Sequence, residues 1–469
     1  MKRKSLLFIL VLFLGLAIAG CKKKDGGGNG KEPEEIPNWQ IEEVTLTFAT
    51  WAYNNAEVET IDSLMVKEFT KKYPNITVNM QIVGESAVWD ENMLQLLETE
   101  EIPDVFLVNR MENFLPYGIL ADLTEYFDAD PDTEYIFDSV RDLGLYKGRR
   151  YVIPTYLYPQ FWVVNLDLLR DSNVAIPSYD WTWDQMEAIA KTVQNDTTHK
   201  IGVFGTAQYF YEYPKVIDAE VNPYAYGYNG TKFNFNTPSY MSAMNRLEIG
   251  IQEGYVVNAI TPEQALEYYG DATIDPRYAG HVGIWREASW SVKEHLGSLP
   301  FHFDIYPAPS GIGMGNTDIA GVSALSPHKE AAYQLLKWMS FSEEGVIRRF
   351  ELYEEYKEEL FISGNNYPYP IVDYGIDGQG NNKIWDNIPY GSTAPGLVSA
   401  QFMESLRNAA TQANKEVIGW DAVDQAVNPY FGRILMGEAD FVSQMEAIQA
   451  DADAALQRKR TEIDNSMNK

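Results

Sequence analysis

The sequence of 469 residues has one cysteine, five histidines and few cations for its number of acids. A single cysteine excludes an intramolecular disulfide and a multi-cysteine zinc site. With 67 acidic against 37 basic side chains the formal net charge is −30, which disfavours binding to nucleic acid and to anionic lipid head groups. The histidines lack metal-ligand spacing, and no Walker or G-x-S-x-G motif is present. No metal and no cofactor are therefore expected.

A run of eighteen apolar residues, long enough to span a membrane, is also lacking. The N-terminus instead has three cations, an uncharged run from Ser5 to Gly20, and then Cys21, which is the pattern of an export signal. The stretch Ile18-Ala19-Gly20-Cys21 resembles a bacterial lipobox, whose cysteine is diacylated. The resemblance implies a signal peptide over 1–20 and a lipid anchor on the extracytoplasmic face of the cell membrane. An ordinary secretory signal with an incidental cysteine is the alternative.

The segment after the cysteine, KKKDGGGNGKEPEEIPN, contains glycine, proline and charge without apolar periodicity. We expect residues 21–39 to form a flexible tether. The whole chain has 45% hydrophobic residues, and its length allows the body after the tether to build the cores of more than one domain.

The body begins with the alternation typical of β/α units. In order, apolar periodicity predicts a strand, a helix, a strand, a helix and a buried strand over residues 44–50, 58–69, 76–82, 89–97 and 105–108. Asn55 is the expected N-cap of the first helix, and Pro74 marks its end. This series is the unit of a parallel sheet with right-handed crossovers, so residues 44–110 are predicted to be half of a doubly wound domain.

A second series begins with a strand over 161–164. Thr182 and Gln185 have the spacing of a capping box at the start of the next helix. Further strands are predicted over 201–204, 282–284, 303–306 and 321–325, followed by a helix over 327–339 with Ser326 as N-cap. Residues 345–469 have a mostly helical pattern, interrupted by a loop over 363–396.

The order of these motifs resembles one protein family. It is carried by KEFTKKYPNITV, PDVFLV, GILADLTEYFD, YKGRRYVIPT with FWVVNLDLL, TWDQMEAIA, HVGIWREASW and SPHKEAAYQLLKWMSFSEEG, between residues 44 and 345. These stretches look like family 1 extracellular solute-binding proteins, the maltose-binding-protein-like receptors of ABC importers.

The resemblance implies an α/β fold of the type II periplasmic-binding-protein class. Two lobes, each a mostly parallel sheet flanked by helices, would hold the ligand in the cleft between them. By analogy, lobe 1 holds 40–157 and 317–358, lobe 2 holds 160–310 and 362–430, and 431–469 is a C-terminal helical segment. The family also implies a monomeric receptor that passes a carbohydrate, expected to be an oligosaccharide, to the permease of an ABC transporter. Hinges are expected near 156–160 and 307–315.

Ligand-binding residues are expected where the predicted strands end. In an open parallel sheet, ligands bind beyond the carboxyl ends of the strands. The first strand places Trp51 and Tyr53 there, and the third places Asn109 and Arg110. We expect Trp51 to be a stacking platform, with Trp285 or Trp290 facing it from the second lobe.

Aromatic residues are concentrated in two segments, with five among the twelve residues 151–162 and eight among the twenty-five residues 204–228. Aromatic faces stack on the C–H faces of sugar rings, while polar side chains bind the hydroxyls, so this composition favours a carbohydrate ligand. About half of these aromatics, Phe161 and Phe204 first, are expected to pack in the core or the hinge. The full set of expected ligand-binding residues is Trp51, Tyr53, Asn109, Arg110, Tyr156, Tyr158, Tyr209, Tyr211, Trp285, Glu287, Trp290 and Tyr390.

One acidic segment has partial metal-binding spacing. Asp128, Asp130 and Asp132 match the first three ligands of an EF-hand loop, but Thr133 and Ser139 replace its glycine and its terminal glutamate. A solvated acidic turn is the preferred interpretation.

Three function classes remain open at this point. The first is a lipid-anchored sugar receptor of an ABC importer, which is not an enzyme. The second is an anchored glycoside hydrolase, because the carboxylate separation that defines such an enzyme is not visible in a sequence. The third is a surface protein for glycan adhesion or sensing.

Overall fold

The structure, a computed structural model, describes residues 37–291, 296–356, 368–389, 395–411 and 417–467. The expected signal peptide, Cys21 and Tyr390 lie outside these ranges. Among the described helices, none combines the length and the apolar character that crossing a membrane requires.

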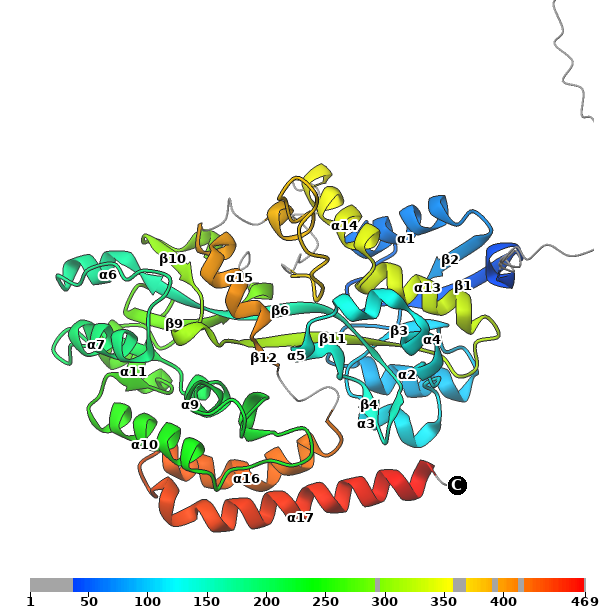
Figure 1. Cartoon of the computed structure of the whole chain (residues 1–469). Coiled ribbons are helices and arrows are strands. Elements are labelled where there is room, and N and C mark those ends of the chain that lie inside the picture. The colour runs from blue at the N-terminus through cyan, green and yellow to red at the C-terminus, as the bar shows by residue number, and fades with distance from the viewer. Residues whose placement is uncertain (1–36, 292–295, 357–367, 390–394, 412–416, 468–469) are drawn as a thin grey trace, which may run out of the picture.

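The larger sheet of the described chain is continuous and runs in the order β2-β1-β3-β11-β6-β9-β7-β8, with β10 on β6 and β12 on β11 (Figure 1). A separate ribbon pairs β4 with β5. The strands are β1 (Val44–Ala49), β2 (Ile76–Met80), β3 (Val105–Val108), β4 (Leu145–Tyr146), β5 (Arg149–Arg150), β6 (Ile153–Asn165), β7 (Ile201–Phe204), β8 (Val256–Val257), β9 (Val282–Ala288), β10 (Phe303–Tyr306), β11 (Met314–Val322) and β12 (Ala410–Thr411).

Strand β6 joins the two halves of this sheet. Its first part pairs antiparallel with β11, and its second part pairs antiparallel with β9 and β10. The first half also contains the parallel strands β1, β2 and β3, and the second half contains the parallel strands β7, β8 and β9. The prediction of a strand confined to 161–164 was therefore wrong, because the strand starts at Ile153 and crosses from one half to the other.

Helices flank both halves (Figure 1). They are α1 (Ile61–Lys72), α2 (Trp89–Glu98), α3 (Met111–Phe114), α4 (Thr124–Ala129), α5 (Asp138–Arg141), α6 (Leu166–Asp171), α7 (Trp183–Val193), α8 (Ala207–Tyr211), α9 (Tyr213–Ile217), α10 (Pro238–Gln252), α11 (Pro262–Tyr269), α13 (Lys329–Ser340), α14 (Glu343–Glu355), α15 (Ala400–Arg407), α16 (Trp420–Leu435) and α17 (Phe441–Met467).

Helix starts follow local hydrogen bonding. The capping box of Thr182 and Gln185 at α7 is confirmed, because each side chain bonds the other's backbone N–H. The predicted caps of α1 and α13 were wrong. Thr60, in place of Asn55, caps α1 through a reciprocal box with Ser63, and α13 starts at Lys329 without a side-chain cap.

The acidic segment before α5 also differs from the expectation of a solvated turn. Asp130 is buried, accepts a hydrogen bond from Tyr333, and pairs at 2.7 Å with Lys337, which binds Asp132 at the same distance. This segment therefore joins α4 to α13 through an ion-pair network.

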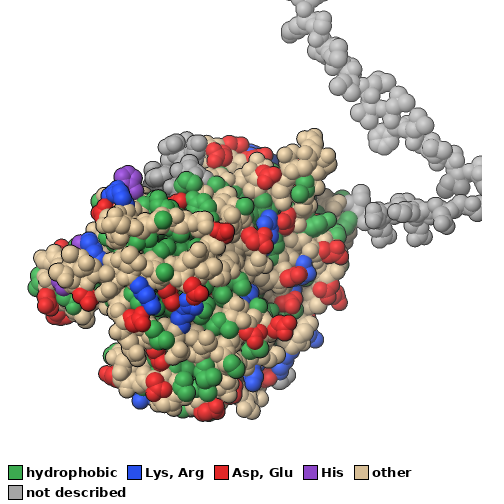
Figure 2. All heavy atoms as spheres, turned by 60° about the vertical axis from the view of Figure 1, so that its left-hand side comes forward, with side chains coloured by type: hydrophobic (Ala, Val, Ile, Leu, Met, Phe, Trp, Pro, Cys, Tyr) green, Lys and Arg blue, Asp and Glu red, His purple; other side chains and the backbone are tan. Residues whose placement is uncertain are grey.

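Two large apolar clusters fill the interior. One packs β1, α1, α13 and α14, and the other packs β9, α7, α10, α16 and α17. Acidic side chains are spread over the face shown in Figure 2, with fewer basic ones between them, in agreement with the net charge.

Candidate functional site

The carboxyl ends of β1 and β3 lie side by side, because these strands are paired in parallel. Trp51 and Tyr53 follow β1 and are half-buried, as are Asn109 and Arg110 after β3. The Trp51 ring lies edge-on against Trp89, with 5.4 Å between centroids and 88° between planes. The four residues expected from the first half are thus at one edge of the sheet.

A segment from the second half meets this edge. Arg110 forms an ion pair of 2.6 Å with Asp421, in the first turn of α16. Two residues further along the chain, the buried carboxylate of Glu112 accepts a hydrogen bond of 2.7 Å from the Gly419 N–H. Burial raises the pKa of Glu112, and the Gly419 hydrogen bond opposes this shift.

Aromatic rings line the start of α16. Tyr211 stacks on Tyr226, with centroids 4.7 Å apart and planes at 15°, and Trp420 packs 5.0 Å from Tyr226. The Tyr226 hydroxyl donates to Asp424 over 3.4 Å. Tyr226 has a φ of 60°, a strained conformation for a bulky residue, which the surrounding rings hold in place.

A buried ion pair lies beside these rings. Arg286 of β9 donates to Glu212 over 2.8 Å, and the Glu212 side chain is 0% exposed. Desolvation raises the pKa of Glu212, while Arg286 counteracts that effect. Burial, together with Asp424, also raises the pKa of Tyr211. The second half therefore presents stacked rings with carboxylate and guanidinium groups around them.

Three other expected residues lie near the end of β9 and on β6. Trp290 is 40% exposed, and Tyr158 lies edge-on to it with 6.5 Å between ring centroids. Glu287 accepts a hydrogen bond of 3.0 Å from the Tyr278 hydroxyl and lies 3.9 Å from Arg277.

The remaining expected residues are enclosed by protein. Tyr156, Tyr209 and Trp285 are buried, and the Arg349 guanidinium lies 4.5 Å from the centre of the Tyr156 ring. Of the two tryptophans expected to face Trp51, Trp290 is the one with exposed surface. Phe161 is buried as expected, and Phe204 packs against the core.

Residues Trp420, Asp421 and Asp424 were not among the sequence-based candidates. They lie in a region whose apolar pattern predicts only helices. The signal in the sequence that could have found them is a glycine, Gly419, directly before a tryptophan and an aspartate. In the structure Gly419 has a φ of 93°, a backbone conformation that favours glycine.

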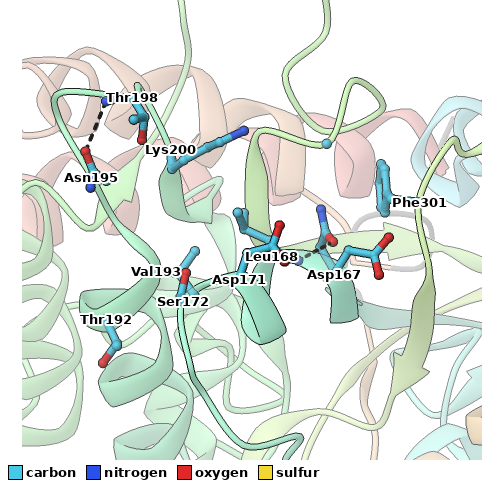
Figure 3. A pocket seen from close by; sticks show the side chains of 12 residues that line it. Asp167, Leu168, Asp171, Ser172, Thr192, Val193, Asn195, Thr198, Lys200 and Phe301 are labelled. Atoms are coloured by element: carbon cyan, nitrogen blue, oxygen red, sulfur yellow. Dashed lines mark hydrogen bonds between the residues drawn. The ribbon is translucent and has the colours of Figure 1, made fainter.

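A pocket of about 370 Å³ opens at the opposite edge of the second half, where β7 and β9 begin (Figure 3). Asp167 and Asp171 of α6 and Lys200 line it. Asp167 already pairs with Arg170 and His302, and Lys200 contacts His281 over 2.9 Å. Because it lies at the amino ends of the parallel strands, it is separate from the candidate site.

Comparison with known proteins adds to this geometry. The sequence profile described as bacterial extracellular solute-binding protein matches residues 54–346, more than half of the chain. The chain belongs to this family. It is therefore a binding protein and not an enzyme, and its place is outside the cytoplasm.

Two curated relatives resemble this solute-binding protein. An arabinooligosaccharide-binding protein of Bacillus subtilis is 27% identical over 74% of this chain and 78% of its own. An uncharacterised ABC transporter extracellular-binding protein of Pyrococcus horikoshii is 23% identical over 88% of this chain and 93% of its own.

Solved structures share the fold. The cyclic α-maltosyl-1,6-maltose binding protein from Arthrobacter globiformis has a TM-score of 0.65 at 20% identity, covering 89% of this chain and 100% of that one. The sugar-binding protein MalE from Xanthomonas citri also gives 0.65, at 18% identity over 90% of this chain and 99% of that one. The fold is thus the type II periplasmic-binding-protein fold, α/β with flanking helices.

Proposed function

We propose that this solute-binding protein captures an oligosaccharide between the two halves of its sheet and delivers it to the permease of an ABC transporter. The observation that carries the proposal is the pairing of aromatic faces with polar groups where Arg110 meets Asp421. Sugar rings have apolar C–H faces and a rim of hydroxyls, and such a site matches both.

The proposed ligand contacts come from both halves. Trp51, Tyr53, Asn109 and Arg110 would contact it from the first. The second would supply a larger set, which the structure extends beyond the sequence-based candidates: Tyr158, Tyr211, Glu287, Trp290, Asp421 and Asp424.

The site favours a neutral sugar over a uronic acid. Its guanidinium groups already have carboxylate partners, with Arg110 on Asp421 and Arg286 on Glu212. A sugar carboxylate would have to compete with these pairs. The names of similar proteins, which mention an arabinooligosaccharide and a cyclic maltosyl-maltose, agree with a neutral oligosaccharide.

We assign the two halves to the proposed lobes, 40–157 with 317–358 and 160–310 with 362–430, although Ile371 and Asp373 hydrogen-bond to the backbone of Phe137 and Tyr135 in the first half. Strands β6 and β11 would be the crossing segments, because β6 pairs with strands of both halves. A ligand that contacts both lobes binds the closed state better and shifts the population toward it. A monomer anchored through Cys21 would present this closed form to the permease.

Calorimetric titration with arabinooligosaccharides and maltooligosaccharides tests the proposal, with product analysis in the same samples. We expect saturable binding without turnover, and a sugar at 100 times its dissociation constant should raise stability by about 2.7 kcal/mol. If neither sugar series binds and a charged or non-sugar solute does, the carbohydrate assignment is contradicted.

A further inference from the structure

Helix α17 spans both halves of the molecule (Figure 1). It has 27 residues, which corresponds to a length of about 40 Å. Its first turns are fixed to the second half, where the Phe441 N–H donates to Glu248 over 2.6 Å. Further along, Gln449 bonds the backbone of Phe233 and Phe235 at 2.9 and 2.8 Å.

The other end of α17 contacts the first half. Asp464 accepts a hydrogen bond of 2.5 Å from the Tyr146 hydroxyl and forms an ion pair of 2.6 Å with Lys147. Ile463 is 1% exposed and packs in the cluster that contains Leu115. The contact with Lys147, and after it the hydrogen bond from Tyr146, lower the pKa of Asp464 below its usual range.

The attachment to the second half is much the larger. Helices α16 and α17 share a core with α10 that includes Val423, Phe431, Ile448, Ala452 and Leu456. Among the described residues, these helices and the loop before them contribute two buried apolar side chains, Ile418 and Ile463, to the cluster on the first half. If the halves part, the helix pair therefore stays with the second half, and the contacts of Asp464 break.

The contact also lies on the ligand side of the first half. The segment Leu115–Tyr117, against which α17 packs, follows β3 by a few residues, as do Asn109 and Arg110. Separation of the two halves at the candidate site thus separates Asp464 from Tyr146 and Lys147.

We propose that the C-terminal end of α17 is a latch, made of Asp464, Tyr146 and Lys147, that forms when the halves close and sets ligand affinity without touching the ligand. The inference rests on the proposed function for its effect on sugar binding, but its effect on closure does not need a sugar. Asp464 is a positioning residue, because it acts on the equilibrium between open and closed states.

Closure is measured by the distance between spin labels in the full-length chain. Exposed Glu125 of α4 and Glu263 of α11 are replaced by labelled cysteines, and Cys21 by serine. Without sugar, Asp464→Asn should lower the ratio of closed to open molecules by about tenfold. This is the change expected from losing one charge-assisted hydrogen bond whose strength is reduced by partial exposure to solvent. Tyr146→Phe should act in the same direction, and the two changes together should be less than additive.

The matched control is Glu462→Gln. It removes the same charge from the same helix, but Glu462 is exposed, and its ion pair among the described residues is with Lys459 of α17 itself, at 3.4 Å. This variant should have the wild-type distances. The same distance distribution in Asp464→Asn as in wild type would overturn the latch.

Affinity gives a second measurement. For an arabinooligosaccharide or maltooligosaccharide that binds, Asp464→Asn should raise the dissociation constant by up to the same tenfold, mainly through faster dissociation. Unchanged affinity for a sugar that does bind would also overturn the latch. If neither sugar series binds but the distances shift, the proposed function fails and the latch stands.

Discussion

The guanidinium of Arg110 lies 2.6 Å from the carboxylate of Asp421, which joins the end of β3 to the start of α16. This pair brings together residues from the two halves at the edge of the sheet where the parallel strands have their carboxyl ends, which is where ligands bind in open α/β sheets. At this candidate site the second half is therefore represented by the helix α16 in addition to β9.

Replacing Trp51 by alanine should separate a ligand contact from a core contact. We expect Trp51→Ala to lower sugar affinity by about 2 kcal/mol, or thirtyfold in dissociation constant, because the half-buried ring would lose its stacking on the sugar. Calorimetry on the folded variant measures this change. Trp285→Ala is the contrast, since its fully buried ring should cost about 3–5 kcal/mol of stability with little change in affinity. Wild-type sugar affinity in Trp51→Ala would mean that Trp51 has a structural role and does not contact the ligand.

Removing one partner of the buried pair between Glu212 and Arg286 should destabilise the fold. Glu212→Gln leaves the guanidinium without a counter-charge, at a cost of about 3–5 kcal/mol for a fully buried pair and less here because Arg286 is 15% exposed. Denaturant unfolding measures the loss. The double variant Glu212→Gln with Arg286→Met should recover part of it, and a double variant no more stable than the single one would argue against an electrostatic cause.

Lys215 should make stability depend on pH. Burial lowers its pKa from 10.5 to about 8, and its ammonium donates to the Ala409 carbonyl over 3.3 Å. The folded state therefore releases this proton before the unfolded state does, so the free energy of unfolding should rise by about 2 kcal/mol between about pH 7 and 9.5. In Lys215→Met this contribution to the rise in the free energy of unfolding should be missing. Denaturant unfolding of wild type and variant at both pH values measures the difference. An equal rise in the two proteins would contradict the prediction.

Cys21→Ala tests the proposed lipid anchor. Acylation at the only cysteine would hold the protein on the membrane through its chains, so the variant should move from the membrane fraction to the soluble one. Fractionation with immunodetection measures this. Equal partitioning of variant and wild type would favour an ordinary secretory signal.

Local sequence signals predicted the β/α units well. The alternation over 44–48 and the buried run over 105–108 correspond to β1 and β3, because each strand's pattern depends on its own residues. The candidates Trp51 and Arg110 followed from those strand ends.

Long-range features were harder to predict. Strand β6 contains Pro154 and Pro159, which lack the N–H that a central strand uses, so the sequence argued against a strand there. The structure accommodates them where β6 pairs with β11, whose register shifts between Thr317 and Ile319. Likewise, it is the ion pair between Arg110 and Asp421 that places Asp421 of α16 at the candidate site.

The position of β11 has a consequence for folding during synthesis. This strand, at Met314–Val322, lies between β3 and β6, so the first half of the sheet lacks one of its inner strands until that part of the chain has been made. Pairing across such sequence separations is slow, because the loop between the strands must be closed before their contacts form. The N-terminal residues therefore leave the ribosome long before their sheet can be completed, and the emerging chain stays incompletely folded over that interval.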